Sequence, residues 1–135
     1  MKIKKIFFIL MLVNFSNCVD TLEKFSYIKS RDRLIKSINT EYSGIVIEKF
    51  SPRKNMESTH FALNTGDTIC PTNSIVMEIL NIGDSIRKDS GDNYISIYSK
   101  EGELKKTWLM KIPSKYREDD RFPVQWKGKW MEASE

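Results

Sequence analysis

The fold is decided by residues 94–112, which read YISIYSKEGELKKTWLMKI. Within Tyr94–Tyr98 the two isoleucines alternate with polar and aromatic residues, so they fall on one face of a strand and the tyrosines on the other. Lys100–Glu103 supplies the glycine of a hairpin turn, and Leu104–Ile112 alternates again as the returning strand. These residues predict a β-hairpin.

Short β-branched runs separated by turn signals precede this hairpin. Strands are expected at 44–50, 59–63, 68–70 and 84–88, with a short helix at 75–80 after the capping residues 71–74. Gly83 stands where that helix would stop. Short strands interrupted by one helix are typical of a small barrel.

The segment 20–39 carries apolar residues mostly three apart, with charged residues between them, which predicts an amphipathic helix. Ser30–Arg33 interrupts the apolar stripe, so a broken helix is the alternative to a continuous one. Because the charges are of both signs, we expect the helix to begin as a tether and then pack on the domain rather than lie on a membrane.

The last 22 residues begin as a polar loop and then alternate. Apolar residues and a glycine occupy the even positions between Phe122 and Trp130, and polar residues or proline the odd ones. A period of two predicts a further strand, or an extended segment laid over the barrel.

Together these elements predict an α+β fold that is mostly β. A signal helix and an amphipathic helix precede a small five- to six-stranded barrel of the OB or SH3 type. The expected divisions are a signal peptide at 1–17, a tether and amphipathic helix at 18–41, the barrel at 42–113 and a tail at 114–135.

The first 18 residues have the order of a secretory signal. Three lysines within Met1–Lys5 precede eight unbroken apolar residues, Ile6–Val13, and a short stretch of small and polar residues ends at Cys18. A membrane-spanning helix needs roughly 20 apolar residues, so this run is too short for an anchor. We therefore expect export.

At Phe15–Cys18 the chain resembles the lipobox of bacterial lipoproteins, in which the cysteine becomes the first residue of the mature chain. The resemblance implies that Cys18 is lipidated and that the protein is held at the cell envelope, in the outer membrane or facing the periplasm. Each buried methylene contributes ~0.8 kcal/mol, so several acyl chains anchor stably. The alternative is ordinary signal cleavage at or beyond Cys18, which gives a soluble periplasmic protein.

Charge weakens a nucleic-acid interpretation. Three of the 22 basic residues lie in the signal and all 18 acidic residues lie beyond it, so the mature chain carries 19 basic against 18 acidic residues. Nucleic-acid binders cluster basic residues on one face, whereas here the two signs are interspersed. We expect no nucleic-acid partner.

A second resemblance covers about residues 41–112 and is to uncharacterised small lipoproteins of Bacteroidota. It is carried by Ser43–Val46, His60, Gly83–Ile86 and Lys88. The resemblance implies an envelope location and no particular activity.

Few residues point to catalysis. His60 is the single histidine, and metal sites usually take two or more His or Cys ligands. A His60–Cys70 dyad is one hypothesis; a half-exposed strand histidine and a small buried cysteine are the favoured alternative. A calcium site is a further hypothesis, with side-chain oxygens from Asp84, Asp89, Asp92 and Asn93. Turns rich in Asp and Asn are the favoured explanation of these residues. We predict no catalytic residue, metal ligand or cofactor.

Three tryptophans are the candidate binding residues, because tryptophan dominates binding hot spots. These are Trp108, Trp126 and Trp130. The favoured alternative is that they cover the core.

Two hypotheses of function follow. The first is a non-enzymatic binding or structural module, held to the membrane by a lipid anchor and engaging a protein or glycan partner. The second is a small periplasmic enzyme or enzyme-inhibitor domain that uses His60, Cys70 or the acids of residues 84–92.

Overall fold

The computed structural model describes residues 20–134 with their side chains, and of residues 2–19 only the backbone of the first helix. Two compact units make up the chain, residues 1–33 and 34–135. The elements are α1 (Lys2–Asn39), β1 (Tyr42–Phe50), β2 (His60–Leu63), β3 (Thr68–Ile69), α2 (Ser74–Ile79), β4 (Ser85–Lys88), β5 (Tyr94–Tyr98), β6 (Leu104–Trp108), α3 (Ser114–Arg117) and the 3₁₀ turns η1 (Val124–Trp126) and η2 (Met131–Ala133). The predicted signal peptide and Cys18 lie outside the residues whose side chains are described.

The described part of α1 confirms a helix over residues 20–39, and it runs without a break through Ser30–Arg33. In the first unit Leu22 and Phe25 are exposed, at 63% and 65%. In the second unit Leu34 and Ile38 are buried. The predicted apolar stripe is therefore buried mainly at its C-terminal end.

Six antiparallel strands form one sheet in the order β3-β2-β1-β4-β5-β6. With its three helices, this confirms an α+β fold that is mostly β. Among the described strands β3 and β6 are edges and do not pair with each other, so closure into a barrel is not shown.

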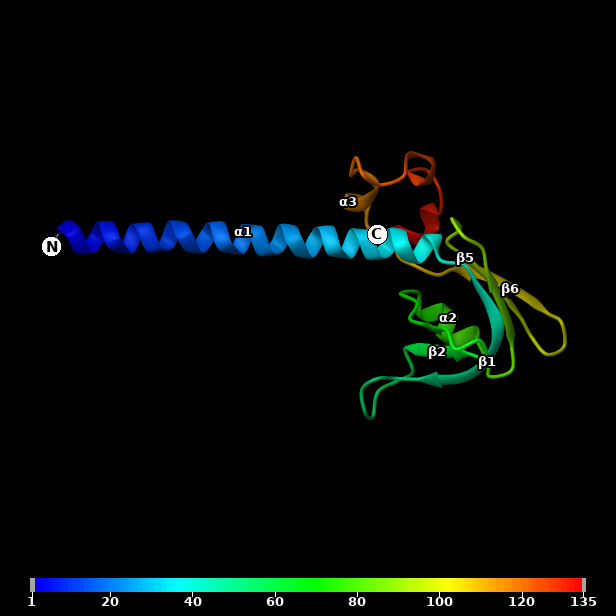
Figure 1. Ribbon diagram of the computed structural model, residues 1–135. Coiled ribbons are helices and arrows are strands. Elements are labelled where there is room, and N and C mark those ends of the chain that lie inside the picture. Colours follow the sequence, from blue (N-terminus) through cyan, green and yellow to red (C-terminus); the bar gives the residue numbers. More distant parts are fainter. Residues whose placement is uncertain (1, 135) are drawn as a thin grey trace. The chain divides into compact units, whose positions relative to one another are not determined.

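The long strand β1 belongs to both halves of the sheet. Tyr42–Ile45 pairs with β4, and Val46–Phe50 pairs with β2 across a register irregularity between Val46 and Glu48. Such an irregularity bends a strand and increases its twist. Figure 1 shows β1 curving around α2, so that the two halves of the sheet enclose a common core.

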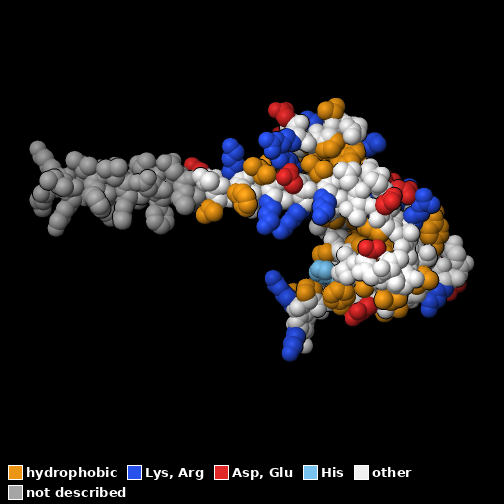
Figure 2. Space-filling view, viewed as in Figure 1, with side chains coloured by type: hydrophobic (Ala, Val, Ile, Leu, Met, Phe, Trp, Pro, Cys, Tyr) orange, Lys and Arg blue, Asp and Glu red, His pale blue; other side chains and the backbone are white. Residues whose placement is uncertain are grey.

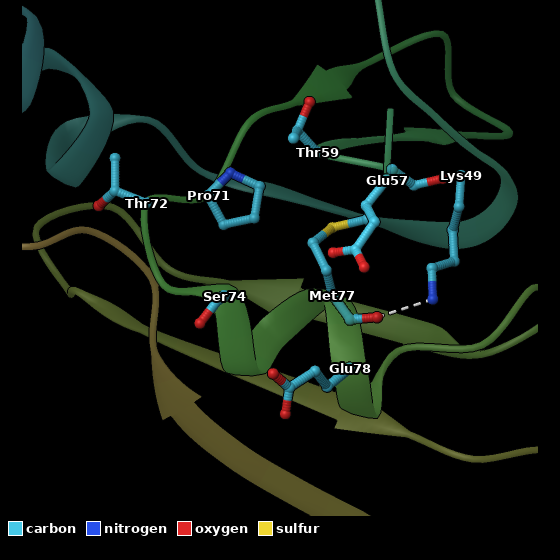
Figure 3. Close-up of a pocket in the computed structure, with 9 residues that line it drawn as sticks. Lys49, Glu57, Thr59, Pro71, Thr72, Ser74, Met77 and Glu78 are labelled. Atoms are coloured by element: carbon cyan, nitrogen blue, oxygen red, sulfur yellow. Dashed lines mark hydrogen bonds between the residues drawn. The ribbon is translucent and has the colours of Figure 1, made fainter. Parts of the chain in front are cut away.

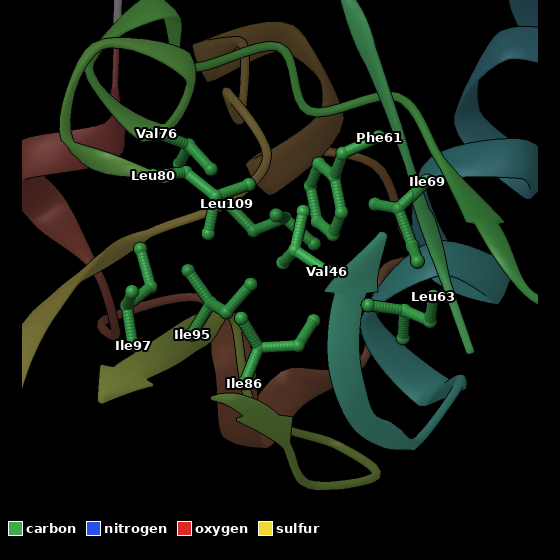
Figure 4. Packing of buried hydrophobic residues seen from close by; sticks show 10 residues of the cluster. All are labelled: Val46, Phe61, Leu63, Ile69, Val76, Leu80, Ile86, Ile95, Ile97 and Leu109. Carbon is green, nitrogen blue, oxygen red and sulfur yellow. The ribbon is translucent and has the colours of Figure 1, made fainter. Parts of the chain in front are cut away.

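Ten buried residues fill that core, and they come from five strands, from α2 and from the segment after β6 (Figure 4). They are Val46, Phe61, Leu63, Ile69, Val76, Leu80, Ile86, Ile95, Ile97 and Leu109. Ile95 and Ile97 are 0% and 1% exposed, which confirms the predicted inner face of the hairpin. Burial of this apolar surface is the main favourable contribution to folding.

Asn73 caps α2 and ties it to the end of β6. Its Oδ1 accepts a hydrogen bond from Ile75 N at 3.1 Å, and its Nδ2 donates to the carbonyl of Trp108 at 2.6 Å. The backbone N–H groups of Thr72 and Asn73 both donate to the carbonyl of Leu109 at 3.2 Å. The predicted helix is confirmed, and Asn73 is the one of the four expected capping residues that is its N-cap.

The returning strand is shorter than expected: β6 ends at Trp108 and not at Ile112. Beyond it the amide of Asn93 pairs with both backbone groups of Met110, at 2.8 and 3.0 Å, in place of a strand ladder. The register sets Lys105 and Thr107 beside the core isoleucines. Within β6 the alternating set, Leu104, Lys106 and Trp108, therefore lies on the outer side of the sheet, and Leu104 is 52% exposed. Beyond β6 the alternation is lost, because Met110 packs against the core and Ile112 is buried.

The tail does not form the strand predicted over 122–130. Instead α3, η1 and η2 fold it into a compact curl, joined to the segment after β6 by one bridge between Ile112 and Ser134. Pro123 precedes η1 as its N-cap, and Trp130 adopts a left-handed backbone with φ of 53°. A proline cannot donate to a strand ladder, and a left-handed residue reverses the chain.

Arg117 holds the curl from inside. Its guanidinium donates to four carbonyls of the following turns, those of Trp126, Lys127, Lys129 and Trp130, at 2.6–3.3 Å. These carbonyls converge on one point because the chain curls, and an extended chain would spread them apart. Burial lowers the pKa of Arg117, and the four acceptors offset the loss of hydration.

The residues that resemble the lipoprotein motif have structural roles. A Cβ on Gly44 would lie 2.7 Å from Asn64 Oδ1, the atom that accepts from Ile45 N. Gly83 has φ of +95°, a conformation that favours glycine. Asp84 accepts a hydrogen bond from Asn81 N at 2.8 Å.

Lys88, the last residue of that motif, is a buried cation. Its Nζ donates to the carbonyls of Ile38, Thr40 and Asp89 at 2.7, 2.8 and 3.2 Å. It therefore binds one carbonyl in the last turn of α1 and one just beyond its end, as a lysine near a helix C-terminus often does. Burial lowers the pKa of Lys88 to about 8, against an opposing effect of Asp92 and Asp89.

Candidate functional site

A pocket of about 410 Å³ lies between α2 and the connection from β1 to β2 (Figure 3). In Figure 3 Thr59 comes from that connection, and Ser74 and Glu78 come from α2. Lys49, Glu57, Ser58, Thr59, Pro71, Thr72, Ser74, Met77 and Glu78 line it.

The cation of this pocket, Lys49, has a structural task. Its Nζ donates to the carbonyls of Met77 and Leu80, both at 2.7 Å. A positive charge at the C-terminal end of α2 satisfies carbonyls that have no partner within the helix. The remaining polar groups are two carboxylates and several hydroxyls, so the pocket can form hydrogen bonds but combines no nucleophile with a histidine.

His60 lies on β2 and is half-buried. Its Nδ1 lies 2.8 Å from the hydroxyl of Thr59, and its ring stacks on Phe50 with the centroids 5.5 Å apart. The last residue pair between β2 and β3 is Phe61 with Ile69, so the next pair, His60 with Cys70, is not formed. No hydrogen bond joins the side chains of His60 and Cys70 in the described structure. The sequence hypothesis of a dyad gains no geometric support.

Cys70 is exposed, so the expectation of a buried cysteine is wrong. The reason is its place directly after β3, where the chain leaves the sheet. Partial burial still raises the pKa of Cys70, which favours the unreactive thiol over the thiolate.

Cys70 lines a pocket of about 220 Å³ beside Tyr42. The pKa of Tyr42 is raised by burial and secondly by Asp67.

The acids of residues 84–92 are engaged in turns. Asp84 accepts from Asn81 N, Asp89 pairs with Arg87 at 2.8 Å, and Asp92 accepts from Tyr94 N at 3.0 Å. Among the described residues no group of three or more His, Cys, Asp or Glu side chains is arranged to hold a metal ion. This arrangement matches the turn interpretation of the sequence.

The structure separates the three candidate tryptophans. Trp126 and Trp130 are buried in the tail at 4% and 7% exposure, with their ring centroids 5.8 Å apart, and Phe122 meets Trp126 edge-on at 6.0 Å. Trp108 is half-buried at the end of β6. Of the three, Trp108 is the one on the outer side of the sheet.

We call this outer side of β1, β4, β5 and β6 the outer face. Strand register arranges it in three rows. The rows are Ile45–Ser85–Tyr98–Leu104, then Ser43–Arg87–Ser96–Lys106, then Tyr94–Trp108. A polar row thus lies between two rows that carry aromatic side chains, and Tyr98 is 39% exposed.

A hollow of about 190 Å³ opens on this face. Arg87, Asp89, Asp92, Tyr94, Ser96, Tyr98 and Lys106 line it. Several of these side chains are held in place: Lys106 Nζ lies 5.2 Å from the centre of the Tyr94 ring, and the Tyr94 hydroxyl donates to Glu132. Fixed side chains lose less conformational freedom when a ligand binds.

The sequence interpretation placed the tyrosines opposite the core isoleucines but did not identify them as candidate binding residues. The signal that could have found them is the hairpin register. A turn at 99–103 pairs Tyr98 with Leu104 and Tyr94 with Trp108, which predicts an outer aromatic surface from the alternation alone.

Charge is mixed over the second unit. On the side shown in Figure 2, basic and acidic side chains are interspersed with hydrophobic ones. The expectation of no nucleic-acid partner stays a prediction. Among the described residues, no helix has the length and apolar character to span a bilayer.

Comparison with known proteins finds no matching family model, no similar curated protein and no similar solved structure. The resemblance to envelope lipoproteins therefore stays a prediction made from the sequence.

Proposed function

We propose that this chain is a non-enzymatic binding module of the bacterial cell envelope, exported by residues 1–17 and anchored through lipid on Cys18. The observation that carries the binding role is the outer face, which presents Tyr98, Trp108 and Leu104 beside a polar hollow. Aromatic side chains at a surface are typical of binding sites. The sequence order of charged, apolar and small residues supports the address.

The proposed fold of this module is a partly open barrel of the OB or SH3 type. Two features support it: β1 is shared by both halves of the sheet, and the segments that follow the edge strands β3 and β6 exchange hydrogen bonds between Thr72, Asn73 and Leu109. Slow hydrogen exchange at the amides of Thr72 and Asn73 is expected. Exchange as fast as in an exposed loop would contradict the barrel.

The address is tested by fractionating cells that express the full chain and the C18S variant. We expect the full chain in the membrane fraction, with a mature amino terminus that carries acyl chains in mass spectrometry. The C18S variant should carry no acyl chains, and its mature form should be missing from the membrane fraction. Full chain recovered from the cytosol with Met1 still attached would overturn the proposal.

A further inference from the structure

The hollow on the outer face has a chemistry that selects among ligands. Its lining carries two cations, Arg87 and Lys106, and two acids, Asp89 and Asp92, so its formal charge is zero. Arg87 and Asp89 neutralise each other directly, with Nε and Oδ1 2.8 Å apart. A phosphate or a polyanion would gain no net attraction here.

The same lining offers both kinds of hydrogen-bonding group at close quarters. Arg87 and Lys106 donate, the two carboxylates accept, and the hydroxyl of Ser96 does either. A ligand rich in hydroxyl groups, each of which both donates and accepts, satisfies such a mixed set better than a ligand of one kind. Apolar ligands would leave these groups without partners, which is costly.

The rows on either side supply flat apolar surface. Tyr98 is 39% exposed at the rim, whereas the ring of Tyr94 is held by Lys106 and its hydroxyl by Glu132. The volume of about 190 Å³ lies below the ~300 Å³ at which drug-sized pockets begin. A ligand that fits is therefore small, with polar groups toward the hollow and its apolar side on Tyr98 at the rim.

We propose that this hollow binds one sugar ring of an uncharged glycan, whose C–H side lies on Tyr98 and whose hydroxyls meet the Ser43–Lys106 row. Pyranose rings with equatorial hydroxyls have this combination, because their axial C–H bonds form a flat apolar side. The inference rests on the binding module proposed above and names the class of its ligand.

The test is a calorimetric titration of the full-length chain, in micelles of a detergent without a sugar headgroup, with cellotetraose and with chitotetraose. Saturable binding of at least one of them is expected. Y98A should weaken it at least tenfold because the stacking surface is lost, whereas Y98F should stay within twofold of the unaltered chain. I82A removes an exposed apolar side chain outside the outer face (Ile82 is 56% exposed) and should change nothing.

Three results would overturn the inference: no saturable binding of either glycan, equal binding by Y98A and the unaltered chain, or tighter binding of dextran sulfate, which would indicate an anion site. If neither glycan binds but a partner protein cross-links to Tyr98, the glycan inference is wrong, and the proposal of a binding module is kept. Failure of the envelope address shows separately, in the fractionation with C18S, whatever the titration gives.

Discussion

The β5–β6 hairpin and the C-terminal tail have the same alternation in sequence and fold differently. In the hairpin, Ile95 and Ile97 enter the core and five residue pairs join the strands. In the tail, Phe122, Trp126 and Trp130 are buried while Val124 is exposed, and the backbone curls around Arg117. A period of two describes where side chains point in a strand, but it does not create the partner strand that the backbone requires.

The difference lies in how the backbone groups are satisfied. Hairpin groups pair with a neighbouring strand across a turn of a few residues, while four tail carbonyls accept from a single guanidinium. One buried side chain thereby joins turns that no neighbouring strand supports, and backbone hydrogen bonds within the turns complete the tail.

The largest expected effect is in the hairpin core. I95A should lower the free energy of unfolding of the whole chain by ~2–5 kcal/mol, because a buried isoleucine leaves a cavity when truncated. Chemical denaturation followed by far-ultraviolet circular dichroism measures it. L104A on the outer face is the matched control and should stay within ~0.5 kcal/mol. Equal losses in both variants would contradict the inner and outer assignment.

The next effect concerns the tail. R117M removes the donor shared by four carbonyls. Those of Trp126 and Trp130 keep a backbone N–H donor, whereas those of Lys127 and Lys129 lose the donor that the structure gives them. Each buried group left without a partner costs ~1–3 kcal/mol unless water reaches it. We expect a loss of about 2–3 kcal/mol, seen first as a red shift of Trp126 and Trp130 emission while the sheet signal persists. R121M, at an exposed position, is the control. An unchanged emission maximum in R117M would show that the tail does not depend on Arg117.

A smaller effect is expected at Lys88, and it depends on pH. K88M removes the side-chain donor to the carbonyls of Thr40 and Ile38, of which that of Ile38 still accepts from Gly91 N; this should cost on the order of 1 kcal/mol near pH 7. In the unaltered chain the folded pKa is about 8 and the ordinary value 10.5. Between these values the unfolded chain binds the extra proton, so the contribution of Lys88 to stability rises with pH.

Comparing the unaltered chain with K88M between pH 8 and pH 10.5 separates the effect of Lys88 from that of other titrating groups, which both proteins share. The difference in unfolding free energy between the unaltered chain and K88M should grow from pH 8 to pH 10.5, by up to ~3 kcal/mol at one pKa unit per ~1.4 kcal/mol. Guanidinium chloride melts at closely spaced pH values measure it. A difference that shrinks with pH would mean that the folded state prefers the ammonium.

Most of the sheet could be predicted from the sequence, because alternation, turn residues and the capping Asn73 each act locally. The buried cations could not. Lys88 and Arg117, and the half-buried Lys49, look like surface residues in a sequence, since burial of a cation is normally excluded. Their partners are carbonyls up to 50 residues away, and no residue type in the sequence marks a carbonyl that lacks a donor.

The candidate site was predicted in part. Trp108 was singled out for its residue type, and the structure places it on the outer face beside Tyr94. Trp126 and Trp130 were chosen by the same argument and are buried. Residue type alone cannot separate these cases, because the outcome depends on whether a strand or a curl forms. Hairpin register is the additional information that distinguishes them.

The smallest effect tests the link between the two regions. The Tyr94 hydroxyl of the hairpin donates to Glu132 of the tail, and Trp130 Nε1 donates to Asp92 at 3.3 Å. Y94F removes the first bond and keeps the ring, so a loss of ~0.5–1 kcal/mol is expected. Y98F is the control, since no hydrogen bond of the Tyr98 hydroxyl occurs in the described structure. The bond between Tyr94 and Glu132 is exposed to solvent. E132Q keeps an acceptor oxygen and should lose little stability, whereas E132A should lose as much unfolding free energy as Y94F. If Y94F and Y98F unfold at the same denaturant concentration, the hairpin and the tail are joined through Trp130 and the Ile112–Ser134 bridge instead.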